Sequence, residues 1–382
     1  MTNIIAFLNT GHLSKDERVY FHQAKSLSNV GYKVHIISTK EEYCEINSNI
    51  SINSFNGDGL TQKGRIKKMV EYLSIISPDV IICDSPLSVL ASNLYKKKST
   101  VKIVYDVTEW YPSKKNLRNY NFLSIILKFF TLNFLNLLAG IKTDSFLFGE
   151  YYKSIPFRIL FSWKEYIYLT YYPDLKYIKY YPIEKITSKI NCLYSGLITN
   201  DKGIDSFIHS IDIASRQLQK IQFNLHVIGI FPSEKDHENF KFMCSKLNKN
   251  VHVDQEGLLP FSDFCKVIGN THLFFDLRQI DLENNYCLPI KLFYYLACGR
   301  PVIYSNLKSI RKEIKNFNFG YLCQPNDHHS ISNHIIEYID HPEIYFEHAN
   351  NALNISRSKY NWSTIDKKFI SFISNKKSNT KS

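Results

Sequence analysis

Short apolar runs alternate with helix-length amphipathic stretches along nearly the whole chain. The apolar runs have the length of buried strands, and the stretches between them repeat apolar residues at helical spacing. This alternation is typical of a parallel sheet with helices on its faces. In the front half the expected strands are Ile4–Leu8, Val34–Ser38, Ile50–Phe55, Asp79–Cys83, Lys102–Val107 and Ser145–Phe148. After residue 190 the pattern restarts, and the expected strands are Asn191–Ser195, Phe223–Ile230, Val251–Asp254, His272–Leu277, Pro301–Ser305 and Gly320–Cys323.

The length of the chain also favours two domains. Its 382 residues exceed the ~250–300 at which a single hydrophobic core stops growing. The periodicity breaks within Tyr171–Lys189, where two prolines interrupt clustered tyrosines and lysines. We therefore predict an α/β fold with two doubly wound, Rossmann-like domains that face each other across a cleft, at residues 1–180 and 190–370. The polar, lysine-rich end at residues 371–382 is expected to be a disordered basic tail.

The net charge of +12 is distributed unevenly along the chain. Residues 1–190 carry +9, residues 191–370 are neutral, and residues 371–382 carry +3. A basic half can attract an anionic membrane or a phosphorylated substrate, and it can equally be a solvated basic face. Nucleic acid is not expected as a partner, because the basic residues are scattered and no nucleic-acid-binding motif occurs.

The eight cysteines form no Cys-x-x-Cys pair and mostly lie in apolar runs, as buried free thiols do. This predicts a reducing, cytoplasmic location and no structural zinc. The apolar run at the amino terminus is too short for a secretory signal and is expected to be the first strand.

Two loops of the rear half have features of an anion site. Ligands of doubly wound sheets bind beyond the carboxyl ends of the strands. In LYSGLITNDKGIDSFI, Gly196 allows a close backbone approach, and Lys202 with Gly203 precedes an amphipathic helix. Helix amino termini attract anions and a lysine adds charge, so the loop suits a diphosphate. An ordinary strand-turn-helix connection would have the same pattern.

The second loop is the start of LPIKLFYYLACGRPVIYSN, residues 288–306. Pro289 suits the first turn of a helix, and Lys291 lies within that turn. A lysine there opposes the helix dipole unless an anion lies nearby. The alternative is a lysine that points into solvent.

Together these motifs resemble those of family-4 glycosyltransferases, which have the two-domain GT-B fold. The rear-half motifs are Gly196 with Lys202-Gly203, Glu256-Gly257, LPIKLFYYLACGRPVI and FGYLCQPND, and the front-half motifs are DERVYFHQAKSLSNVGYKVHIIS and VYDVTEWYP. The similarity spans Ile4 to about Ile373. It implies retaining transfer of a sugar from a UDP- or GDP-linked donor to an acceptor, in the cleft between the domains, without a metal or other cofactor.

The resemblance implies roles for individual residues. Gly196 and Lys202 would approach the donor diphosphate, and Pro289, Ile290, Lys291 and Leu292 would present a helix amino terminus to it. Glu256, Gly257 and Leu258 would lie against the base. Fixed cations must stabilise the leaving diphosphate where no metal does so. The expected catalytic residues are therefore Lys202 and Lys291, with Glu109 facing the sugar or the acceptor.

Several residues depart from the family pattern. Tyr286 and Tyr294 stand where the family has two glutamates, the second of which contacts the donor ribose. A phenol can hydrogen-bond a hydroxyl group but cannot make a carboxylate's bidentate contact. Glu283 is a candidate replacement for the carboxylate, and Arg278 is a candidate additional cation.

Leu197 and Thr108 stand where the family has an arginine and a histidine, which leaves Asp106 and Glu109 as the polar groups of the front loop. These departures leave two alternatives open. One is a catalytically silent GT-B scaffold that binds nucleotide or polysaccharide machinery, and the other is a nucleotide-sugar epimerase.

Two front-half features have a structural and a functional interpretation. Asp16 and Arg18 are expected to form a local salt bridge that positions the first long helix, with acceptor binding as the alternative. Phe122–Ile141 is long enough to span a membrane, but Lys128, Asn133 and Asn136 argue against insertion. We expect a buried core helix.

The alternative for Phe122–Ile141 is a helix on an anionic membrane surface, assisted by Lys114, Lys115 and Arg118. A surface helix would suit a peripheral enzyme on the cytoplasmic face of the inner membrane. Its glycan acceptor would be lipid-linked, in surface polysaccharide synthesis.

Overall fold

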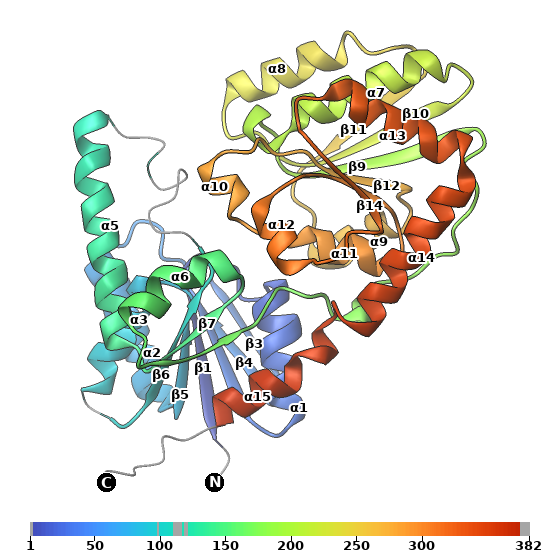
Figure 1. The fold of residues 1–382 in the computed structure, drawn as a ribbon. Helices are drawn as coiled ribbons and strands as arrows, with labels where there is room; N and C mark the ends of the chain where they lie inside the picture. The colour runs from blue at the N-terminus through green and yellow to red at the C-terminus, as the bar shows by residue number, and fades with distance from the viewer. Residues whose placement is uncertain (1–2, 98, 110–116, 118–120, 375–382) are drawn as a thin grey trace. The chain divides into compact units, whose positions relative to one another are not determined.

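The computed structural model describes residues 3–97, 99–109, 117 and 121–374. Contacts divide the chain into two compact units. The first consists of Met1–Tyr171 with Ile365–Ser382, and the second of Tyr172–Thr364. Figure 1 shows the course of the chain.

The end of the chain returns to the first unit, which differs from the expected boundary at residue 370. Helix α15 (Asp366–Ser374) packs on α1 (Lys25–Asn29). The Nζ of Lys102 also donates to the carbonyl oxygen of Phe372 at 2.9 Å. Residues 371–374, expected in the disordered tail, are therefore helical, and residues 375–382 lie outside the described residues.

The first unit contains an eight-stranded sheet in the order β3-β4-β2-β1-β5-β6-β7-β8. The strands are β1 (Ile4–Asn9), β2 (Lys33–Ser38), β3 (Tyr43–Asn47), β4 (Ile50–Ser54), β5 (Val80–Cys83), β6 (Lys102–Val107), β7 (Ser145–Phe148) and β8 (Glu165–Tyr168). All neighbours pair in parallel except β3 and β4.

Helices cover both faces of this sheet. They include the π-helical segment Glu17–Ala24 with α1, then α2 (Gln62–Ile76), α3 (Pro86–Lys96), α5 (Phe122–Lys142) and α6 (Tyr151–Leu160). One core joins the sheet to α2, α3, α5 and α6, with Met69, Val89, Ala139 and Phe157 as examples from the four helices. These four helices therefore form one layer on one face of the sheet.

The second unit contains a six-stranded parallel sheet in the order β11-β10-β9-β12-β13-β14. The strands are β9 (Lys189–Leu197), β10 (Gln222–Ile230), β11 (Val251–Glu256), β12 (Leu273–Asp276), β13 (Val302–Ser305) and β14 (Gly320–Cys323). The helices are α7 (Ile204–Gln217), α8 (Glu234–Cys244), α9 (Phe261–Gly269), α10 (Leu282–Asn285), α11 (Lys291–Ala297), α12 (Lys308–Glu313), α13 (His328–Asp340) and α14 (Pro342–Ser358), with short 3₁₀ turns at Leu175–Tyr177, Asn200–Lys202 and Trp362–Thr364.

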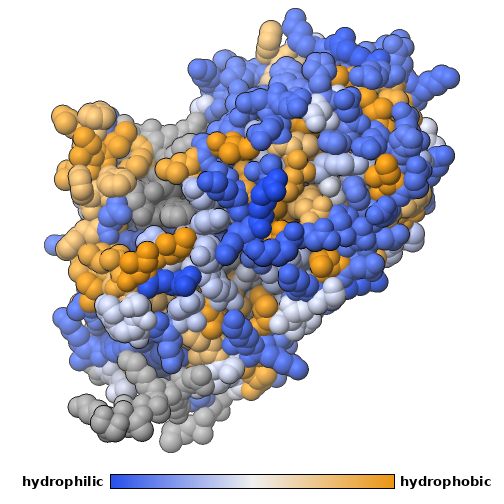
Figure 2. Space-filling view, in the orientation of Figure 1, coloured by the Kyte–Doolittle hydropathy of each residue, from blue (hydrophilic) through white to orange (hydrophobic). Residues whose placement is uncertain are grey.

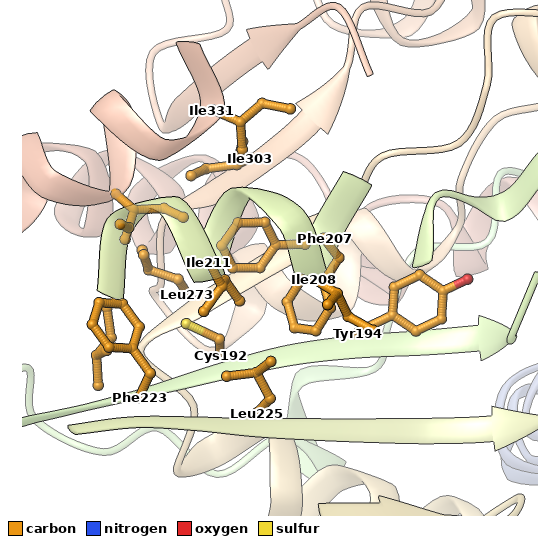
Figure 3. Packing of buried hydrophobic residues seen from close by; sticks show 14 of the residues in the cluster. Cys192, Tyr194, Phe207, Ile208, Ile211, Phe223, Leu225, Leu273, Ile303 and Ile331 are labelled. Atoms are coloured by element: carbon orange, nitrogen blue, oxygen red, sulfur yellow. The ribbon is translucent and has the colours of Figure 1, made fainter. Parts of the chain in front are cut away.

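The amphipathic helix α7 fixes the loops at the carboxyl end of this sheet. Its apolar face, including Phe207 and Ile211, packs on Cys192, Tyr194, Phe223 and Leu225 from β9 and β10 (Figure 3). Burying a large apolar side chain contributes ~1.5–3 kcal/mol. The start of α7 is thereby held where β9 ends.

Each of the expected strands is present, and the predicted α/β class with two Rossmann-like sheets is confirmed. The strands β3 and β8 were not expected. Both are edge strands whose residues are mostly exposed or half-buried. Such strands need no continuous apolar run, which is why hydrophobic patterning does not find them.

Candidate active site

The end of β9 brings Gly196 close to Lys291. Gly196 has a φ of +144°, which a side chain would strain. A Cβ on Gly196 would lie 4.0 Å from the Nζ of Lys291. The neighbouring strand supplies Gly229, where a Cβ would overlap the carbonyl oxygen of Gly196. Gly196 thus leaves its backbone bare beside a lysine amine, and Gly229 lets β10 approach β9 closely at this point.

The position of Lys291 is fixed through a buried tyrosine on its own helix. Tyr295 shares a hydrogen bond with Ser195 of β9 at 2.6 Å, and its ring stacks on Phe274 with centroids 4.0 Å apart. Burial raises the pKa of Tyr295, so its hydroxyl stays neutral. This contact ties α11 to the end of β9. The Lys291 amine itself lies 5.8 Å from the centroid of the Phe264 ring.

Lys202 lies in the loop that follows Gly196. Its Nζ donates to Oδ1 of Asn284 at 2.6 Å and lies 3.8 Å from a carboxylate oxygen of Asp201. Asn284 is buried, and its amide nitrogen donates to the carbonyl oxygens of Gln279 and Asp201. A neutral amide therefore orients the ammonium group without cancelling its charge. Glu283 lies next to Asn284 in α10, and its backbone N–H donates to the capping side chain of Asp281.

The helix that follows Lys202 starts without a side-chain cap. Its N-cap is Gly203, with a φ of +86°. A Cβ at Gly203 would overlap the carbonyl oxygen of Leu277, so glycine lets the helix start pack against the end of β12. The first N–H groups of a helix are otherwise unsatisfied. They are a favourable environment for an anion.

The other predicted donor residues have different environments. Helix α11 starts at Lys291, two residues later than Pro289. Pro289 and Leu292 are buried, and Ile290 is half-buried. Tyr294 is also buried, and its ring packs edge-on against Phe261.

The loop that was expected to contact the base lies open at the end of β11. Glu256, Gly257 and Leu258 are exposed, and a Cβ on Gly257 would meet no neighbouring atom within 4 Å. Leu258 is 71% exposed. An exposed leucine beside bare backbone offers an apolar surface on which a flat ring can lie.

Arg278 is held by Asp276 through two hydrogen bonds, one of them from Nε at 2.7 Å. Burial alone would lower the pKa of Arg278, and the carboxylate of Asp276 raises it. The arginine is charged, but the adjacent carboxylate compensates that charge. It is a less suitable anion ligand than the sequence suggested.

In the first unit, two expectations about Asp16, Arg18 and Asp106 are wrong. Asp16 caps the π-helical segment by accepting from the backbone N–H groups of Arg18 and Val19. The guanidinium of Arg18 instead makes a two-point ion pair with buried Asp106, at 2.6 and 2.8 Å. Asp106 is therefore occupied by Arg18 and does not face a ligand.

A polar cluster at the carboxyl ends of β1 and β5 was missed by the sequence reasoning. The Nδ1 of His12 lies 3.2 Å from a carboxylate oxygen of Asp16. Asp84 accepts from the backbone N–H groups of Thr10 at 2.7 Å and Gly11 at 2.9 Å. The signal was present in the sequence, because polar residues follow directly after both strands.

Glu109, which was predicted as catalytic, belongs to this cluster. Burial lowers the pKa of His12, but Asp16, Asp84 and Glu109 outweigh it and raise the pKa to about 9. The cluster at neutral pH is thus an imidazolium surrounded by carboxylates. Carboxylates and charged donors of this kind suit hydroxyl-rich ligands.

Residues 182–379 match the family model for glycosyl transferases group 1. The chain belongs to this family. The match covers the second unit from residue 182 onward, including the Gly196 loop and the start of α11. No curated protein matches the sequence of this glycosyltransferase.

The glycosyltransferase also resembles solved structures over nearly its whole length. Sucrose-phosphate synthase from Thermosynechococcus elongatus is 13% identical with a TM-score of 0.73, and the alignment covers 97% of this chain and 98% of that one. HepE from Anabaena, solved with UDP-glucose, is 13% identical with a TM-score of 0.71, covering 97% and 99%. WaaG, a glycosyltransferase involved in lipopolysaccharide biosynthesis, is 14% identical with a TM-score of 0.67, covering 97% and 100%. The predicted GT-B fold is confirmed, and the family-4 subdivision stays a prediction.

Proposed function

We propose that this glycosyltransferase transfers a sugar from a nucleoside diphosphate donor to a glycan hydroxyl, and that UDP is the nucleotide to test first. The observation that carries the proposal is the bare backbone of Gly196 beside the Lys291 amine. The structure of HepE contains UDP-glucose, which supports the choice of UDP.

The two lysines would stabilise the leaving group. Cleavage of the sugar–phosphate bond increases the negative charge on the diphosphate while the sugar becomes oxocarbenium-like. Lys202 is oriented by Asn284, and Lys291 is positioned through Tyr295. Removing one preorganised donor costs on the order of 3 kcal/mol in the transition state. We propose that these amines replace a metal and that the anomeric configuration is retained.

We propose that the cluster around His12 binds the acceptor. Glu109 can accept hydrogen bonds from sugar hydroxyls, and protonated His12 can donate one. Buried Asp84 supports the cluster by holding the backbone N–H groups of Thr10 and Gly11. The acceptor is proposed to be lipid-linked, with the enzyme peripheral on the cytoplasmic face of the inner membrane. The exposed apolar helix α5 supports this part of the proposal.

Calorimetric titration tests the donor site. Wild-type protein is titrated with UDP, GDP, their glucose conjugates and uridine. Lys202→Ala and Lys291→Ala should each weaken UDP binding about 10- to 100-fold, because each removes a charge-assisted hydrogen bond. Binding of uridine should change little. Lys249→Ala is the matched control, since this exposed lysine lies at the amino end of β11 in the same unit.

The outcomes of the titration distinguish the proposed donor site from its alternatives. Equal losses for UDP and uridine would show that the lysines do not contact phosphate. Absence of binding for every nucleotide would favour a catalytically silent scaffold that binds polysaccharide machinery. Once a donor is found, NMR of the product gives its anomeric configuration, and turnover in EDTA tests metal independence.

A further inference from the structure

Helix α5 is apolar around most of its circumference and lies largely outside the core. Within the described residues it is long and apolar enough to cross a membrane, with a mean hydropathy of 1.8. Only 6% of its most apolar 18-residue window is buried inside the protein. Its exposed apolar residues are Phe122, Leu123, Ile126, Leu127, Phe129, Phe130, Phe134, Leu137 and Ile141. Figure 2 shows hydrophobic residues gathered over this helix. The expectation of a buried core helix is therefore wrong.

Three polar side chains of α5 make hydrogen bonds inside the protein. Thr131 donates to the carbonyl oxygen of Leu127, and Asn133 to that of Phe129, both at 2.8 Å. Asn136 accepts from the hydroxyl of Tyr105 at 3.0 Å. Satisfied polar groups cost much less in an apolar medium than unsatisfied ones. These hydrogen bonds reduce the cost of bringing Asn133 and Asn136 into contact with lipid. The sequence alone had counted both residues against insertion.

A groove of about 890 Å³ lies between α2 and α3 in the same unit. Its lining includes Lys63 and Lys67 of α2 and Lys97 at the end of α3. Glu71 is also part of the lining, and its Oε1 lies 3.9 Å from the Nζ of Lys67. Apolar side chains, among them Val70, Ile75 and Leu94, line the rest. Three ammonium groups against one carboxylate give the groove a positive charge.

The groove and α5 belong to the same layer of helices. Helix α3 packs against both α2 and α5 (Figure 1). All three helices pack through one core on the same face of the sheet. A membrane surface in contact with α5 would therefore lie close to the groove.

We propose that the groove between α2 and α3 binds an anionic phospholipid of the membrane on which α5 lies. The lysines would contact the phosphate, and Val70, Ile75 and Leu94 would contact the first part of an acyl chain. This inference rests on the membrane association proposed above. An amphipathic lipid matches both the charge and the apolar lining of the groove. The expected basic flank of α5 at Lys114, Lys115 and Arg118 lies outside the described residues.

Vesicle co-sedimentation of the full chain tests the proposal. The vesicles contain phosphatidylcholine alone or phosphatidylcholine with phosphatidylglycerol. The groove variant combines Lys63→Gln, Lys67→Gln and Lys97→Gln. Its control combines Lys220→Gln, Lys235→Gln and Lys249→Gln, which removes three exposed lysines from the second unit. A third variant carries Leu123→Gln, Leu127→Gln and Phe130→Gln on α5.

Wild type and control should bind the anionic vesicles equally. The groove variant should bind them on the order of 100-fold more weakly, since each basic residue near an anionic surface contributes about fivefold. The α5 variant should lose binding to both kinds of vesicle. Equal losses of vesicle binding in the groove variant and the control would show that only the net charge of the protein matters, and would overturn the proposal. Normal binding by the α5 variant would overturn the membrane contact on which the proposal rests.

A photoreactive phosphatidylglycerol with a diazirine in its acyl chain locates the lipid. Cross-linked peptides should include Ile75 in α2 and Leu94 in α3. Cross-links confined to α5, or spread over both units, would overturn the groove site and leave α5 as the only contact. Titration of the groove variant with UDP keeps the two proposals separate. Unchanged UDP binding would show that a failed lipid site does not affect the donor site.

Discussion

Replacing His12 by glutamine should remove a pH-dependent part of the stability of the first unit. His12 lies beside Asp16 at 3.2 Å, and Asp16, Asp84 and Glu109 overcome its partial burial and raise its pKa from 6.5 to about 9. The folded protein therefore holds a proton that the unfolded chain releases at lower pH. That contribution to stability is fully present below pH 6.5 and is lost as the pH rises through about 9.

The size of the effect follows from the pKa difference and the exposure of the side chain. A rise from 6.5 to about 9 would correspond to ~3 kcal/mol if the group were fully shielded. The His12 side chain is 35% exposed, so solvent screening reduces this to about 1–2 kcal/mol. His12→Gln should cost this amount below pH 6.5 and much less above pH 9.

Hydrogen exchange of peptides from β1 and β5 in urea measures this difference. The readout is local because two units need not unfold in a single transition. His35→Gln is the control, since burial lowers the pKa of His35, so its effect on stability lies below pH 6.5 with the opposite sign. A cost for His12→Gln that is the same on both sides of the window would refute the assignment of a protonated His12 and reduce the residue to a packing role.

Two further predictions concern stability. Gly229→Ala should lower the free energy of unfolding of the second unit by about 1–3 kcal/mol, because its Cβ would overlap the carbonyl oxygen of Gly196. Urea unfolding of the second unit measures this loss, and Gly257→Ala is the control, which should be nearly neutral because open space surrounds that position. Equal losses of stability in the two variants would contradict the close approach of β9 and β10. Arg18→Met should cost about 3–5 kcal/mol in the first unit by leaving Asp106 buried without its partner. The double variant with Asp106→Leu should recover part of that loss, and a single-variant cost below ~1 kcal/mol would mean that the pair behaves like an exposed one.

The fold was predictable because burial leaves a strong imprint on the sequence. The central strands are continuous apolar runs, as Val80–Cys83 and Val302–Ser305 illustrate. The boundary of the first unit was less predictable. Helix α15 is amphipathic like any other C-terminal helix, and only tertiary contacts such as that of Lys102 with Phe372 attach it to the first unit. Helix α5 was predicted to be buried because its composition is that of a core helix, but most of its apolar side chains are exposed.

The candidate site was predictable where one residue type has a specific backbone role. Gly196 and Gly203 were selected from the sequence, and both have the positive φ angles that favour glycine. The ion pair of Arg18 was not predictable, because it joins residues 88 positions apart in the chain. Arg18 pairs with Asp106 rather than with Asp16 two residues away, and no local pattern announces that choice.

The partner of each cation decides whether it can still bind a substrate. Arg18 and Arg278 are each held by a carboxylate at hydrogen-bonding distance, so an incoming phosphate would have to compete with a fixed negative charge. Lys202 is instead oriented by the neutral amide of Asn284, and its nearest carboxylate in the described part of the chain, that of Asp201, lies at 3.8 Å. An amide fixes the geometry of the ammonium group and leaves most of its charge available to an anion. Of these three cations Lys202 is therefore the best suited to meet a diphosphate, although its sequence motif alone has the pattern of an ordinary strand-turn-helix connection.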